Sequence, residues 1–204
     1  MDAGDELEVV DRKVTQLFAL VSQALAQATH ALLHGETELG RQVVEGDQVV
    51  DDLTSDVELL VWQQIDRGQG PASLRKLVGL LLILPELERS ADLAEHVAQR
   101  AVDNLGSEMS PVSRGIVQRM TEVALDMWRS AADAYGDRES RSAALAEDDV
   151  EMDILRDRLL GEITVEGMPA SVASQVTLLA RFYERLGDHA VNLARRIELL
   201  DAPR

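Results

Sequence analysis

Acidic residues spaced four apart recur at matching places in the two halves of the chain. The repeated pairs are Asp47 and Asp51, Glu88 and Asp92, Asp149 and Asp153, and Glu184 and Asp188. Residues four apart lie on one face of an α-helix, one turn from each other. Like charges placed in this way repel, so several converging pairs need a cation between them. Carboxylate oxygens suit Mg, Ca or Mn, and carboxylate clusters also bind Fe or Zn. The eight acids are therefore candidate metal ligands.

Spacing alone does not identify a metal site, because eleven acidic pairs of this spacing occur in the chain. Most such pairs lie on solvated helix faces. The repeated set differs because it recurs in the same order in both halves. In addition, Glu88 continues the apolar row formed by Leu77, Leu81 and Leu84. An acid on a buried row is expected to be paired or ligated.

The elements that carry these acids are predicted to be long helices. Apolar residues recur every three or four positions, as one buried helix face requires. The predicted helices cover residues 7–33, 38–65, 72–104, 111–135, 139–162 and 169–200. Gly35 is expected to cap the first helix, and Pro85 is expected to kink the third.

The helices form two similar sets of three. The segment "LERSADLAEHVAQR" (87–100) shares six of fourteen positions with "YERLGDHAVNLARR" (183–196). We therefore predict an all-α protein of two tandem three-helix bundles related by internal duplication, over residues 1–106 and 107–204. Short loops make neighbouring helices antiparallel, so the second and third helix of each bundle can bring four carboxylates together.

Composition excludes several classes of function. The formal net charge of −17 argues against direct nucleic-acid binding, because phosphates would be repelled. The longest apolar run, "LVGLLLILP" (77–85), is too short to span a bilayer, so membrane insertion is not expected. The absence of cysteine excludes disulfides and thiolate metal sites, and it fits a cytoplasmic location. The sequence contains no phosphate-binding loop, no H-E-x-x-H motif and no convincing nucleophile–base arrangement.

Together these residues resemble the PhoU family, the accessory and regulatory proteins of bacterial phosphate uptake. The resemblance covers nearly the whole chain and rests on "EGD" (45–47), "ELERSAD" (86–92) and above all "YERLGDHAVNLA" (183–194). It implies a non-enzymatic cytoplasmic protein that negatively regulates phosphate uptake and phosphate-starvation two-component signalling. The implied partners are the ATPase subunit of a phosphate ABC transporter and a sensor histidine kinase, and the resemblance also allows for a homodimer. Members of the family bind metal through Glu/Asp-x-x-x-Asp motifs, which correspond here to the eight acids above.

The two copies of the motif are not equally complete. The first copy has Ser90 and Ala91 where the family signature has an apolar residue and glycine, so the second copy is expected to be the better metal site. Two alternatives to a metal-binding regulator stay open. One is a carboxylate-bridged helical metalloenzyme, although no Glu-x-x-His pair of the kind that ferritin-like di-iron proteins use occurs. The other is a metal-free structural interaction bundle with solvated acidic faces.

Overall fold

A computed structural model describes residues 3–68, 70–137, 141–165 and 168–201, and these ranges contain helices and no strand. The helices are α1 (Ala3–His34), α2 (Thr37–Asp66), α3 (Pro71–Val102), α4 (Leu105–Glu108), α5 (Pro111–Asp137), α6 (Ser142–Val165) and α7 (Ala170–Asp201). The predicted all-α fold of two three-helix sets is confirmed, and the six long helices lie within four residues of their predicted bounds. The predicted start of the fifth helix, residue 139, lies outside the described residues.

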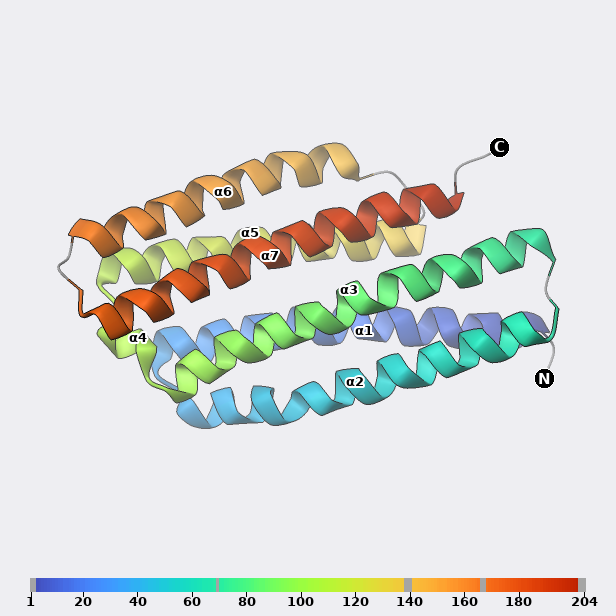
Figure 1. Ribbon diagram of the computed structural model, residues 1–204, viewed down its shortest axis with the longest axis horizontal. Helices are drawn as coiled ribbons and strands as arrows, with labels where there is room; N and C mark the ends of the chain where they lie inside the picture. The colour runs from blue at the N-terminus through green and yellow to red at the C-terminus, as the bar shows by residue number, and fades with distance from the viewer. Residues whose placement is uncertain (1–2, 69, 138–140, 166–167, 202–204) are drawn as a thin grey trace.

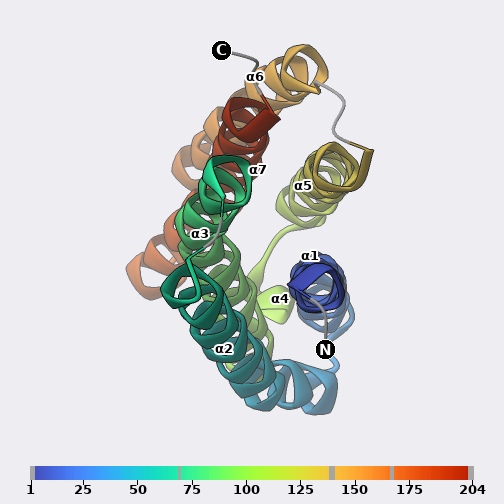
Figure 2. The ribbon, with the colours of Figure 1, turned by 90° about the vertical axis from the view of Figure 1, so that its right-hand side faces the viewer.

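The two central helices are α3 and α7, which lie side by side (Figure 1). Helix α2 packs on the outer side of α3 and α6 on the outer side of α7, while α1 and α5 form a second layer behind them (Figure 2). We call α1–α3 the first unit and α5–α7 the second unit. The units join through contacts of α3 with α7 and of α1 with α5. No helix in the described ranges is both long and apolar enough to cross a membrane.

The core follows directly from the apolar periodicity of the helices. Along α1, Val10, Val14, Leu17, Val21 and Leu25 are all buried, at spacings of three and four. Leu, Val and Ala supply most of the remaining core, as a chain with 3% aromatic residues requires. Burial of these side chains supplies the main driving force for folding.

The connections between helices depend on a few specific residues. Gly35 adopts a positive φ of +71° after α1, which confirms the predicted glycine cap. The short helix α4 was not predicted, and it lies within the predicted break between the units. Arg114 of α5 donates hydrogen bonds to the carbonyl oxygens of Gly106 and Leu33, so it ties α5 to the ends of α4 and α1. Helix α3 continues through Pro85 from Pro71 to Val102.

Candidate metal centre and the seam between the units

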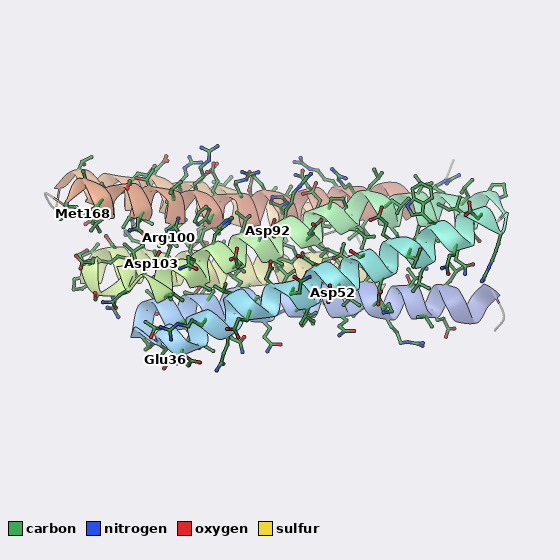
Figure 3. All side chains as sticks on the ribbon, turned by 60° about the horizontal axis from the view of Figure 1, so that its bottom comes forward. Glu36, Asp52, Asp92, Arg100, Asp103 and Met168 are labelled. Carbon is green, nitrogen blue, oxygen red and sulfur yellow. The ribbon has the colours of Figure 1, made fainter. Side chains whose placement is uncertain are left out.

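In the first unit, α2 and α3 bring three carboxylates together. Asp47, Asp51 and Asp92 each offer an oxygen, and these oxygens all lie within 4.8 Å of one another. All three residues are half-buried. Figure 3, in which α2 is turned toward the viewer, labels Asp92 on α3 and the exposed Asp52 on the adjacent helix. Within the part of the chain that the structure describes, no other set of three acidic or histidine side chains is as close.

Negative charge is crowded around this group. Burial, together with repulsion from Asp51, Asp92, Glu95 and Glu88, raises the pKa of Asp47 to about 6. Partial desolvation and repulsion from Asp51 also raise the pKa of Glu88, although its side chain is exposed. A divalent cation would relieve this repulsion, and oxygen donors at this spacing suit hard cations. The residues of the first unit therefore fit a metal ion.

Two cavities lie between the helices of the first unit. Asp47 and Glu95 line a cavity of about 180 Å³ between α1, α2 and α3. Thr54 and Glu88 line a second cavity of about 110 Å³ between α2 and α3. The Thr54 hydroxyl oxygen is buried and has no hydrogen-bond partner among the described residues. An oxygen donor without a partner beside a carboxylate is a further feature that a bound cation or water would satisfy.

In the second unit, an arginine lies among the corresponding acids. Arg156 of α6 donates from Nη1 to Asp153 Oδ1 at 2.7 Å and to Glu184 Oε1 on α7, and from Nη2 to Asp157 Oδ1 at 3.0 Å. Partial desolvation, followed by repulsion from neighbouring acids, raises the pKa of Asp149 and of Asp188. All four predicted acids are thus neighbours, but a guanidinium already bridges two of them. The geometry favours the first unit as the metal centre, opposite to the ranking expected from the signature.

The burial expected for Glu88 is wrong, because its side chain is exposed and Glu86 is the buried acid of α3. Glu86 is 5% exposed and contacts two residues of α7: its carboxylate lies 2.5 Å from His189 Nδ1 and forms an ion pair with Arg196 Nη2 at 2.9 Å. Burial lowers the pKa of His189, and the charge of Glu86 partly opposes that shift. Sequence reasoning assigned no role to His189. The signal for Glu86 was its place on a second row, whose other members Ile83, Ser90, Leu93 and Val97 are all buried.

A different contact occupies the equivalent place at the other end of the α3–α7 seam. Arg100 of α3 lies 5.6 Å from the ring centroid of Phe182 on α7, and His96 stacks on the same ring at 5.2 Å (Figure 3 labels Arg100). In the duplicated segments, Phe182 corresponds to Glu86 and Arg100 to Arg196. The seam therefore uses an ion pair at one end and a cation–π contact at the other. His96 therefore packs on Phe182, and it is not part of the group of three carboxylates.

Comparisons with known proteins match both units. The family model described as "PhoU domain" matches residues 14–101 and again residues 117–197. A "phosphate-specific transport system accessory protein PhoU homolog" of Rhizobium meliloti is 30% identical over 200 residues, which are 95% of this chain and 84% of that protein. The "PhoU homolog 2" of Mycobacterium tuberculosis is also 30% identical, over 95% of this chain and 93% of its own. The crystal structure of PhoU from Pseudomonas aeruginosa shares the fold with a TM-score of 0.89 at 24% identity, over 98% of each chain.

Proposed function

Because this chain belongs to the PhoU family, we propose that it is a non-enzymatic accessory protein of a phosphate transport system. The observation that carries this proposal is similarity to accessory proteins of phosphate transport at about 30% identity along 95% of the chain. The similarity includes both units, for which we propose the limits 1–106 and 107–204.

We further propose that the protein works in the cytoplasm as a negative regulator. In this role it lowers phosphate uptake and phosphate-starvation signalling when phosphate is abundant. It does so through contacts with the ATPase subunit of the transporter and with a sensor histidine kinase. The family relationship supports these partners. An acidic chain that carries a net charge of −17 also suits basic surfaces on partner proteins.

The regulatory role is tested by deleting the gene and measuring a phosphate-starvation reporter in phosphate-rich medium. We expect derepression of the reporter, and a plasmid copy of the wild-type gene should restore repression. Unchanged expression in the deletion strain would remove the assigned role. Binding to each partner is measured separately, with the purified ATPase subunit and with the cytoplasmic part of the kinase.

Metal binding is the second part of the proposal. Asp47, Asp51 and Asp92 would hold a divalent or transition metal ion, of which Mg, Mn, Zn and Fe are the candidates. The ion would neutralise the crowded carboxylates and so hold α2 against α3. The test is elemental analysis of protein purified without a metal-affinity tag, followed by titration. Less than about a tenth of an ion per chain, with no uptake on titration, would favour the metal-free interaction bundle.

The metalloenzyme alternative predicts a different result. Redox or hydrolytic sites in helical proteins require a base or histidine ligands beside the carboxylates. The nearest histidine along α3, His96, stacks on Phe182 instead. Turnover of oxygen or of phosphate esters by the metal-loaded protein would favour an enzyme over a regulator.

A further inference from the structure

The two acidic clusters differ at one equivalent position. The duplicated segments of α2 and α6 are offset by 102 residues, which relates Asp51 to Asp153. The same offset relates Thr54 in the first unit to Arg156 in the second. One place in the repeated fold is therefore occupied by a short neutral side chain in one unit and by a cationic side chain in the other.

We infer that Arg156 serves as a built-in cation that closes the second cluster to metal, so that the chain binds metal in the first unit alone. This inference rests on the proposed metal binding, which it refines from a duplicated site to a single one. It gives the second cluster a stabilising role that is independent of the metal supply.

Arg156 connects the two helices that carry the acids of the second unit. Its guanidinium donates to Asp153 on its own helix and to Glu184 on α7, so it bridges the two helices that a metal ion would bridge. The side chains of Arg156 and Glu184 are only 25% and 26% exposed. An arginine is always charged, and its rigid fork of donors matches two carboxylates better than a mobile lysine would. A metal ion would have to displace this group from both of its partners.

The two acidic clusters differ in the charges of their neighbours. In the first unit, the charged groups with the largest effect on Asp47 are all acids, and Arg89 acts on Glu88. In the second unit, Arg195 acts on Asp149, and Arg185 and His189 act on Asp188, each opposing the repulsion of the acids. The second cluster therefore has more cationic neighbours than the first, because Arg156 also lies between its acids. A metal cation from solution is therefore attracted more strongly to the acidic cluster of the first unit than to that of the second.

The first unit has open space beside Thr54, the position equivalent to Arg156. Within the part of the chain that the structure describes, the buried Thr54 hydroxyl has no hydrogen-bond partner, and with Glu88 it lines the cavity of about 110 Å³ between α2 and α3. The first unit thus has room and an unused oxygen donor where the second unit has a guanidinium. This is an observation separate from the acids themselves, and it indicates a missing polar partner at this place in the first unit.

The decisive experiment replaces Arg156 by threonine and, in a separate variant, Thr54 by arginine. Equilibrium dialysis then counts the Mn²⁺ ions that each variant binds. Mn²⁺ is the probe because it prefers carboxylate oxygens to the exposed imidazoles of His30 and His34. We expect one ion per wild-type chain, two for Arg156→Thr and none for Thr54→Arg. Arg158→Thr is the matched control, because Arg158 is an exposed arginine on the same helix, and it should bind one ion. Circular dichroism confirms that each variant is folded.

Acid variants show which cluster holds the ion. In the wild-type background, Asp47→Asn should weaken Mn²⁺ binding at least about tenfold, whereas Glu184→Gln should leave it unchanged. Loss of binding in Glu184→Gln, or a folded Arg156→Thr that gains no ion, would overturn the inference while leaving metal binding in place. A wild-type chain that binds no Mn²⁺ while Arg156→Thr binds one would support the role of Arg156 and overturn the proposed metal function. If neither binds Mn²⁺, both proposals fall.

Discussion

The hydroxyl oxygens of Tyr183 on α7 and Thr29 on α1 lie 2.5 Å apart and connect the second unit to the first. The hydroxyl oxygen of Thr121 on α5 lies 3.2 Å from each of them, within hydrogen-bond distance of both. The network lies in the core, where Tyr183 is fully buried. Three helices from both units therefore share one set of buried hydrogen bonds, and its members should be energetically coupled.

Removing the Tyr183 hydroxyl should destabilise the whole protein. Tyr183→Phe deletes the hydroxyl and leaves Thr29 and Thr121 without their shared partner, so the free energy of unfolding should fall by about 1–2 kcal/mol. Urea denaturation monitored by circular dichroism measures the change. In a double-mutant cycle, Tyr183→Phe and Thr29→Val should be clearly less than additive. Additive losses would show that the hydroxyls are not coupled.

Alkaline pH should weaken the fold through the same residue. Burial raises the pKa of Tyr183 to about 12, although hydrogen bonds with Thr121 and Thr29 oppose the shift. An unfolded tyrosine ionises near pH 10, so the stabilisation from the neutral phenol is complete below pH 10 and is lost as pH rises to about 12. The loss should approach about 3 kcal/mol, from two pKa steps of about 1.4 kcal/mol each. Unfolding curves between pH 9 and 12 should show this slope in the wild type and a smaller slope in Tyr183→Phe.

Truncating Glu86 should be far more damaging than truncating Glu88. Glu86→Ala leaves His189 and Arg196 at the seam without their carboxylate, and removing one partner of a buried pair costs about 3 kcal/mol. Glu88 is two residues away on the same helix and is exposed, so Glu88→Ala should change stability by less than about 0.5 kcal/mol. Denaturation in metal-free buffer makes the comparison. Equal effects of the two variants would contradict the burial of Glu86.

A methyl group at Gly106 should disrupt the joint between the units. A Cβ there would overlap the carbonyl oxygen of Leu32 at the end of α1, and backbone cannot move aside as a flexible side chain can. Gly106→Ala should cost about 2 kcal/mol or more, as overpacking usually does. Gly161→Ala is the control, because α6 has open space at that position. It should raise stability by up to about 1 kcal/mol through helix propensity. Thermal unfolding of both variants tests the contrast.

Much of the fold could be predicted from the sequence because long helices with regular apolar rows leave few alternatives. The side of α3 that faces inward could not. This helix packs against α1, α2 and α7, so apolar residues occur on several of its faces and periodicity does not separate Glu86 from Glu88. The four carboxylates of each unit were placed on neighbouring helices correctly. Arg156 escaped notice because an arginine three residues after an acid is usually a solvated pair, and only the fold shows its contact with Glu184.

The joint made by Arg114 and Gly106 has a mechanical consequence. A hinge requires a few residues that are free to change their backbone angles. Here the segment between α3 and α5 contains α4, which packs on α1. The Arg114 guanidinium donates hydrogen bonds to the carbonyl oxygens of Gly106 in α4 and Leu33 in α1. The α3–α7 seam then runs beside this joint along the length of the molecule. A force that a partner applies at one end should therefore move the two units together as one rigid body. It should not separate them by a hinge motion.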